Sequence, residues 1–214
     1  MVADKLAERC AEILDGGEDL GFSHRDSIAT SAGLLYSACM DIHAGYATLS
    51  TPDGPLTIIA DDDAVLASGW TDDTEALVSR THPRLRPALL EPGAGAALEQ
   101  AVAAAEAYYR GDLAAIDQVP VRQISGPYRI RAWEVLRTVA PGHPVTYAQF
   151  ADLTGNPAAV RAAASVCASN AAALFVPCHR VIRTDGGLGG FAFGTQIKRS
   201  LLAREAEAGR AADR

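Results

Sequence analysis

The sequence has few cysteines, few aromatic residues and no long apolar run. Four cysteines in 214 residues are too few for a disulfide scaffold, so we expect free thiols in a reducing, cytoplasmic setting. No stretch approaches the roughly 20 apolar residues that a membrane-spanning helix requires, and the N-terminus lacks the pattern of a secretory signal. Hydrophobic residues still make up 49% of the chain, which is typical of a soluble globular protein.

Basic residues are scarce in the first half of the chain. Residues 1–118 contain 20 acidic and seven basic side chains, a net charge of −13, whereas residues 119–214 contain six acidic and 12 basic ones, a net charge of +6. This reversal predicts that only the second half binds a polyanion such as nucleic acid. On charge alone, a chance difference between two domains is an equally good interpretation.

The hydrophobic periodicity divides the chain into three parts. Residues 1–43 are predicted to be a separate helical extension. Residues 44–118 form a small strand-and-helix domain, and residues 119–214 form a mainly helical domain, so the expected fold class is α+β. In the middle part the patterns predict strands at 46–49, 56–60 and 64–70, an irregular stretch over 71–94, a helix over 96–109 and a strand at 117–121.

A helix-turn-helix pair is expected in the helical domain. Thr146 and Gln149 form a capping box at the start of the first helix, and Asn156 caps a second helix over 157–169. That second helix is rich in alanine, and Arg161 is its only charged side chain. A smooth helix can approach a nucleic-acid groove closely but has few side chains for reading bases. We therefore expect sequence-tolerant DNA binding, with an alanine-rich core helix as the alternative.

The most informative segment is Pro-Cys-His-Arg at 177–180, which lies between apolar residues. A buried strand rarely carries proline in its middle, so the chain is expected to bend at Cys178. Neighbouring cations lower the pKa of a thiol and favour the nucleophilic thiolate, and His179 and Arg180 would supply that environment. Cys178 is therefore a candidate nucleophile, whereas the other cysteines are expected to be small buried apolar residues.

This segment resembles the hallmark of the DNA alkylguanine alkyltransferases, also called methylated-DNA–protein-cysteine methyltransferases. The resemblance runs from about Tyr46 to Glu205, and residues 1–43 fall outside it. Further matches occur in order at Gly54-Pro55-Leu56, Tyr128-x-x-Arg131-x-Trp133, Val145-x-Tyr147, Arg161, Asn170, Gly190–Gly194 and Leu201-Leu202-x-x-Glu205. The resemblance implies direct-reversal DNA repair, in which an alkyl group moves from O6 of a flipped guanine in duplex DNA to Cys178. The reaction would be a single turnover without cofactor or metal.

The resemblance also implies a role for each catalytic residue. Cys178 accepts the alkyl group, His179 takes the thiol proton through a water, and Glu205 orients His179. Asn170 holds the bend before the nucleophile. Tyr147 donates a proton to the departing guanine and helps to rotate the phosphate.

The DNA contacts and the substrate pocket are implied in the same way. Arg161 would fill the gap that the flipped base leaves, and Ala162 beside it would face the DNA. Main-chain groups at the nucleophile and at Val181 would read the guanine edge. Phe191 replaces a usual tyrosine, and Ala192 replaces a frequent hydroxyl residue. The expected pocket residues are Cys167, Val181, Phe191, Ala192 and Gly194.

Two other functions and a metal site fit parts of the sequence. A non-catalytic lesion-binding protein of the same fold would lack the nucleophile, so Cys178 argues against it. A thiol hydrolase would need an oxyanion site, for which only generic loop amides are present. Cys39 and His43 could bind zinc with Cys10 and His24, although buried cysteines and solvated histidines are the simpler interpretation. We expect a monomer that binds double-stranded DNA and no membrane.

Overall fold

The computed structural model describes residues 42–93 and 95–212. The predicted helical extension and the zinc candidates Cys10, His24 and Cys39 lie outside these residues. His43 begins a strand, so the last residue of the predicted helical extension over residues 1–43 is not helical. Within the described ranges, no helix is long and apolar enough to cross a membrane.

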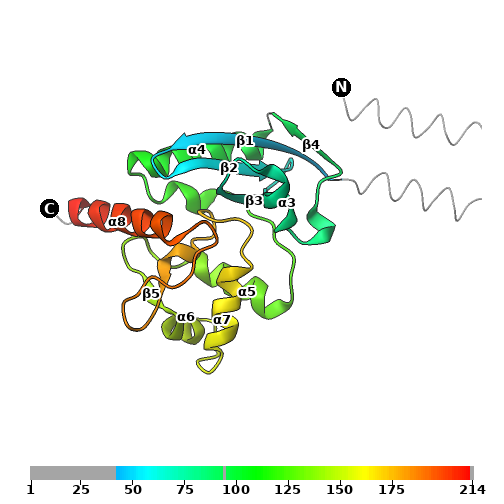
Figure 1. Cartoon of the computed structure of the whole chain (residues 1–214). Coiled ribbons are helices and arrows are strands. Elements are labelled where there is room, and N and C mark those ends of the chain that lie inside the picture. Colours follow the sequence, from blue (N-terminus) through cyan, green and yellow to red (C-terminus); the bar gives the residue numbers. More distant parts are fainter. Residues whose placement is uncertain (1–41, 94, 213–214) are drawn as a thin grey trace, which may run out of the picture. The chain divides into compact units, whose positions relative to one another are not determined.

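A four-stranded sheet forms the first part of the described chain (Figure 1). It contains β1 (His43–Thr51), β2 (Gly54–Ala60), β3 (Val65–Trp70) and β4 (Leu89–Pro92) in the order β3-β2-β1-β4. The first three strands are antiparallel neighbours, and β4 pairs with β1 in parallel. The three predicted strands are confirmed. β4 and the short helix α3 (Thr74–Ser79) were not predicted, because each is too short to show a clear period.

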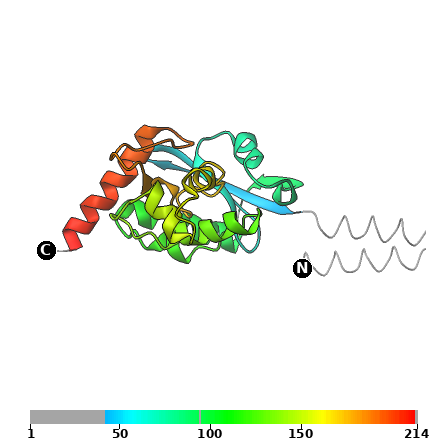
Figure 2. The ribbon, with the colours of Figure 1, turned by 90° about the horizontal axis from the view of Figure 1, so that it is seen from below.

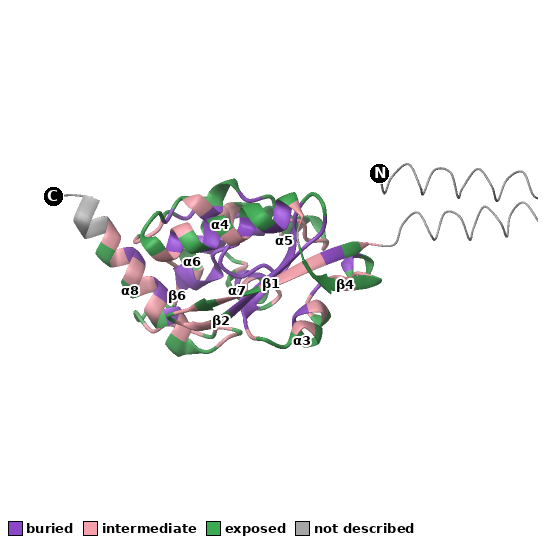
Figure 3. Cartoon of the chain, turned by 90° about the horizontal axis from the view of Figure 1, so that it is seen from above, coloured by how far each residue is buried: buried purple, intermediate pink, exposed green. Residues whose placement is uncertain are grey.

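Helix α4 (Ala96–Arg110) packs on the sheet and was predicted correctly. It ends at Gly111, which adopts the left-handed conformation (φ 108°) that favours glycine. Figure 3 shows its buried and exposed faces. The strand predicted at 117–121 is wrong: this stretch contains the 3₁₀ helix η2 (Ala115–Gln118), and only Val121 bridges to β3.

The second part of the described chain is mainly helical. It contains α5 (Pro127–Arg137), α6 (Tyr147–Leu153), α7 (Val160–Ala168) and α8 (Thr195–Ala212), with a small parallel pair formed by β5 (Val145–Thr146) and β6 (Val181–Ile182). In Figure 2, α7 is yellow and α8 is the red helix that extends toward the C-terminus.

The helix-turn-helix pair consists of α6 and α7, which contact each other. The capping box between Thr146 and Gln149 is confirmed, with both hydrogen bonds present. The second helix begins at Val160 rather than at residue 157. Residues 157–158 are in a turn, in which the carbonyl of Asn156 accepts a hydrogen bond from the amide of Ala159.

One hydrophobic core joins the sheet to the helices. It includes Leu56 of β2, Tyr108 of α4, Trp133 of α5 and Leu201 of α8. The predicted division into domains at residues 118 and 119 stays a prediction. The shared core means that side chains from the sheet reach the helical part.

The segment that leads to Cys178 is attached to β3. The amide of Ser68 donates to the carbonyl of Ala171 at 2.9 Å, and the amide of Ala173 donates to the carbonyl of Ser68 at 3.1 Å. The hydroxyl of Ser68 adds a bond to the carbonyl of Ala173 at 2.6 Å. The sheet therefore fixes the backbone a few residues before the candidate nucleophile.

Candidate active site

Cys178 lies at a bend, as the sequence predicted. It begins the single 3₁₀ turn η3 (Cys178–Arg180), and it is 6% exposed. The side chain of Asn170 holds this bend: its Nδ2 donates to the carbonyl of Val176 at 2.8 Å and to Sγ of Cys178 at 3.2 Å. Buried Leu174 has a left-handed backbone (φ 78°), which is strained for a residue with a large side chain. A strained backbone held by buried hydrogen bonds fixes the position of the thiol.

His179 and Glu205 form a buried pair behind the turn. Nε2 of His179 lies 2.9 Å from Oε1 of Glu205, and both side chains are fully buried. Hydrogen bonds and nearby positive charge lower the pKa of Glu205 to about 2 against the opposing effect of burial, so the carboxylate is ionised and only accepts hydrogen bonds. Nε2 of His179 must therefore carry the hydrogen. This leaves Nδ1 as a proton acceptor.

Nδ1 of His179 is buried, and no hydrogen-bond partner for it is found in the described part of the chain. Burial lowers the pKa of His179 and outweighs the opposite effect of Glu205. The neutral imidazole thus has a free acceptor atom in the residue directly after the nucleophile. This arrangement is the one that a general base needs.

Glu205 accepts hydrogen bonds from three further groups. Arg180 donates through Nε and Nη2 at 2.9 to 3.1 Å, and its Nη1 bonds to the carbonyl of Val139 at 2.6 Å. The hydroxyl of Tyr108 donates to Oε1 at 3.0 Å, and the amide of Gly142 donates to Oε2 at 3.3 Å. Both oxygens of the buried Glu205 carboxylate therefore have charged or polar partners, which a buried charge requires.

A cavity of about 490 Å³ opens on the other side of the nucleophile. Tyr147 at the start of α6 and the loop with Phe191 and Ala192 form two of its walls. Burial raises the pKa of Tyr147, so its hydroxyl stays protonated and can donate a hydrogen bond to a group in the cavity. The cavity is lined by Arg80, Tyr147, Ala164, Cys167, Ala168, Cys178, Gly190, Phe191 and Ala192.

The loop wall of this cavity packs on the sheet. The rings of Phe191 and Phe193 each lie 5.8 Å from the ring of Trp70 and 5.8 Å from each other. Gly69 allows this contact, because a Cβ at this position would overlap the ring of Phe193. The aromatic cluster supports the wall against which a flat ligand could stack.

The electrostatics of the thiol differ from the sequence prediction. Burial raises the pKa of Cys178, and the hydrogen bond from Asn170 and the charge of Lys198 only partly oppose this. Neighbouring cations do not lower it overall, because burial keeps His179 neutral and Arg180 is paired with Glu205. Activation of the thiol therefore depends on transfer of its proton to a base.

Two residues that the sequence analysis missed adjoin the thiol. Lys198 is fully buried, and its Nζ donates to the carbonyl of Val181 at 2.6 Å. It precedes Glu205 by seven residues on one helix, so the spacing could have placed both on the same face. Arg80 donates to the carbonyls of Ala168 and Asn170 at 3.2 and 3.0 Å. No sequence signal marked it.

The remaining predicted residues are less closely grouped. Arg161 and Ala162 are exposed on α7, one turn or less from Ala164 in the cavity wall. Val181 is buried beside the turn, with its carbonyl bonded to Lys198. Gly194 ends the loop with φ 95°. The structure thus gathers Cys178, Cys167, Tyr147, Phe191 and Ala192 around one cavity, with His179, Asn170 and Glu205 behind it.

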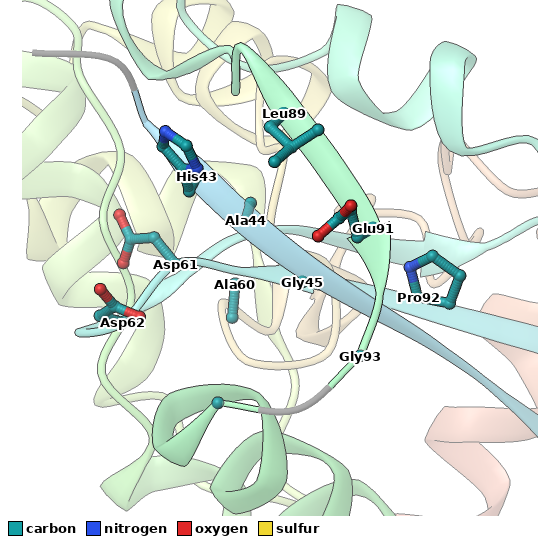
Figure 4. A pocket seen from close by; sticks show the side chains of 11 residues that line it. His43, Ala44, Gly45, Ala60, Asp61, Asp62, Leu89, Glu91, Pro92 and Gly93 are labelled. Carbon is teal, nitrogen blue, oxygen red and sulfur yellow. The ribbon is translucent and has the colours of Figure 1, made fainter. Parts of the chain in front are cut away.

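A different cavity, of about 350 Å³, lies along β1 and β4 (Figure 4). Its lining includes Asp61, Asp62 and Glu91, but Asp61 already pairs with Arg122 and accepts two backbone hydrogen bonds. No lining residue is shared with the Cys178 cavity. The Cys178 cavity is therefore the candidate active site.

The fold and the site define a class of protein: an α+β protein with a helix-turn-helix pair, a cysteine in a cavity and a buried histidine–glutamate pair next to that cysteine. Comparison with known proteins agrees. Residues 127–207 match the DNA-binding domain of 6-O-methylguanine DNA methyltransferase. The methylated-DNA–protein-cysteine methyltransferase of Shigella flexneri is 34% identical over 164 residues, which cover 73% of this chain and 92% of that protein.

One further relative and one solved structure are also similar to this chain. The bifunctional transcriptional activator/DNA repair enzyme Ada of Escherichia coli is 49% identical over 80 residues, but the match spans 37% of this chain and only 23% of Ada. The crystal structure of Mycobacterium tuberculosis OGT in complex with DNA has a TM-score of 0.63 and 31% identity, and the match covers 77% of this chain and 94% of that chain. The chain belongs to the methylated-DNA–protein-cysteine methyltransferase family. The expected α+β fold and DNA-repair methyltransferase function are confirmed.

Proposed function

We propose that this protein repairs double-stranded DNA by moving an alkyl group from O6 of guanine to Sγ of Cys178. The observation that carries the proposal is the position of Cys178 between an open cavity and a neutral histidine. The cavity has an aromatic wall against which a flipped base could stack. The base must leave the helix because the buried thiol cannot reach a guanine that is stacked in a duplex.

The chemistry is a displacement at a saturated carbon. The thiol proton passes to Nδ1 of His179 through a water, the sulfur attacks the alkyl carbon, and the bond between that carbon and O6 breaks. Tyr147 supplies a proton to the departing guanine. Glu205 accepts from Nε2 of His179 and stabilises the imidazolium that forms. A sulfur–carbon thioether is stable, and burial raises the pKa of the neighbouring Cys167 thiol, which makes it a poor nucleophile for removing the alkyl group. Each chain therefore reacts once.

DNA contacts are proposed on the exposed face of α7. Arg161 stands on a helix on which Ala162 and Ala164 are also exposed, so its guanidinium can enter the space that a flipped base leaves. Basic residues of the helical part would supply the salt-dependent affinity for phosphates. We further propose a monomer in a reducing, cytoplasmic compartment, where Cys167 and Cys178 would remain free thiols.

The test is incubation with duplex DNA that carries radiolabelled O6-methylguanine. Transfer of one label per chain supports the proposal, and unmodified duplex serves as the control. Binding of the lesion without label on the protein would favour a lesion-recognition protein. Hydrolysis of thioesters with no transfer would favour a thiol hydrolase.

A further inference from the structure

The Tyr108 hydroxyl connects the sheet part of the protein to the buried His179–Glu205 pair. Tyr108 lies in the last turns of α4 and is fully buried. Its hydroxyl donates to Oε1 of Glu205 at 3.0 Å, across 97 residues of sequence. This is the same oxygen that accepts the hydrogen bond from Nε2 of His179. A side chain of the sheet-covering helix thus contacts the partner of the general base.

We propose that Tyr108 is a positioning residue for alkyl transfer, whose hydroxyl limits how strongly Glu205 attracts the Nε2 proton of His179. The inference rests on the proposed function, because it deepens the role of the same site. Tyr108 acts through Glu205 and does not line the Cys178 cavity.

The proposal rests on the number of hydrogen bonds that Oε1 of Glu205 accepts. This oxygen accepts from Tyr108, from His179 and from both Nε and Nη2 of Arg180, which is more donors than two lone pairs can serve at full strength. Each donor that shares the oxygen reduces the negative charge available to the others. The hydroxyl of Tyr108 therefore weakens the bond to His179, and its removal should raise the proton affinity of His179.

Tyr108 is suited to this role over a wide pH range. Burial and the nearby carboxylate both raise the pKa of Tyr108, so the hydroxyl keeps its hydrogen wherever the protein is folded. A neutral donor also adds no charge to a site that already holds Arg180 and Lys198. It can thus weaken the hydrogen bond from His179 to Glu205 without the long-range electric field that another cation would impose.

The charged groups that act on His179 are all retained when Tyr108 is altered. Glu205 and Lys198 reach it from α8, and Arg180 precedes β6 in the same turn. Asp117 of η2 acts on Arg180 and Glu205 from a further element. A shift in the pKa of His179 after a change at Tyr108 can therefore be assigned to the missing hydroxyl.

Tyr109 supplies a matched control on the same helix. Its hydroxyl donates to Oδ2 of Asp53 at 3.0 Å and accepts from Nε1 of Trp70 at 2.9 Å. It makes no hydrogen bond with Glu205 among the contacts of the described residues. Tyr109→Phe thus removes an equivalent hydroxyl and its hydrogen bonds without touching the His179–Glu205 pair.

The experiment measures two quantities on the full chain: the pKa of His179 from ring ¹⁵N NMR, and the rate of benzyl transfer from free O6-benzylguanine between about pH 5 and 9, a range around the ordinary pKa of histidine. For Tyr108→Phe we expect the pKa of His179 to rise by about half a unit to one unit, and the acidic limb of the rate profile to move to higher pH by the same amount. Tyr109→Phe should leave both at their wild-type values.

A second variant covers the case in which Tyr108→Phe does not fold. Site-specific Tyr108→3-fluorotyrosine keeps the shape and donates a stronger hydrogen bond, so the pKa of His179 should fall. Loss of thermal stability without a shift in either variant would make Tyr108 purely structural and overturn the inference, as would an equal shift in Tyr109→Phe. Failure of the wild type to take up methyl from duplex DNA that carries O6-methylguanine would refute the proposed function instead, and the NMR titration would still test the link from Tyr108 to His179.

Discussion

The sheet part and the helical part of this protein differ in charge and in chemistry. Residues 44–118 carry 12 acidic and four basic side chains, whereas residues 119–214 carry six acidic and 12 basic ones. All the proposed reacting groups come from the helical part. Yet the sheet part supplies Arg80 to the cavity and Tyr108 to Glu205. The acidic part therefore contributes one cavity residue and one hydrogen bond to Glu205 but none of the proposed reacting groups.

The largest expected effect belongs to the nucleophile in the helical part. Cys178→Ser keeps the size of the side chain but replaces a soft thiolate with a poor nucleophile, so transfer should fall by about a thousandfold or more. The check is single-turnover transfer of labelled methyl from duplex DNA. Cys167→Ser is the control in the same cavity and should retain transfer; a loss in both variants would contradict the assignment of Cys178.

Glu205→Gln should have the next largest effect. The amide cannot stabilise the imidazolium of His179, so we expect transfer at neutral pH to slow by about a hundredfold, with little change in DNA affinity. The apparent pKa of Cys178 should rise, and higher pH should recover part of the rate because more thiolate forms without a base. Rate profiles of wild type and variant with free benzylguanine provide the measurement, and superimposable profiles would leave Glu205 a purely structural residue.

The lowered pKa of Glu205 also predicts that the folded protein loses stability in acid. The pKa of Glu205 is lowered from 4.5 to about 2 in the folded protein. Its stabilising contribution is therefore fully present above pH 4.5 and is lost as the pH falls through 2. Urea unfolding across this window should show a pH dependence that is reduced in Glu205→Gln. An equal dependence in both proteins would assign the transition to other carboxylates.

A smaller effect is expected at the DNA contact. Arg161→Ala should slow transfer from duplex DNA by about tenfold, which corresponds to about 1.4 kcal/mol of lost support for the flipped base. Transfer from free benzylguanine should stay unchanged. The two substrates are compared under the same single-turnover conditions. Equal losses on both would show that Arg161 acts on the fold and does not support the flipped state.

The smallest effect comes from the sheet part. Gly69→Ala would push a methyl group into the ring of Phe193 and should lower the free energy of unfolding by about 1 to 3 kcal/mol, as overpacking does. Because Phe193 packs on Phe191 in the cavity wall, transfer from benzylguanine should slow a few-fold. Thermal denaturation and transfer rates test this. An unchanged transfer rate would show that the packing of the sheet on Phe193 does not affect the cavity wall.

Local patterns in the sequence predicted much of the fold. Short runs bounded by turn signals predicted the three long strands, and capping signals predicted the end of α4 and the start of α6. The start of α7 was misplaced because Asn156 and Pro157 resemble a helix cap, whereas here they form a turn. β4 and η2 depend on pairing and packing with distant residues, which no local pattern contains.

The sequence identified the residues of the site better than it predicted their pKa values. The Pro-Cys-His-Arg segment and the resemblance identified Cys178, His179 and Glu205, and the structure brings the three together. The raised pKa of Cys178 follows from burial, which a motif does not reveal. Arg80 and Tyr108 reach the site only through the packing of the sheet on the helices, so their positions could not be inferred from spacing.

The most direct test of the central claim is peptide mapping by mass spectrometry after incubation with excess O6-methylguanine duplex. Cys178 and Cys167 share one cavity, so the position of the methyl group distinguishes the activated thiol from its neighbour. We predict one methyl group per chain, on the peptide that contains Cys178, and no further reaction with fresh substrate. Methylation of Cys167, or repair of more than one equivalent of lesion per chain, would contradict the account.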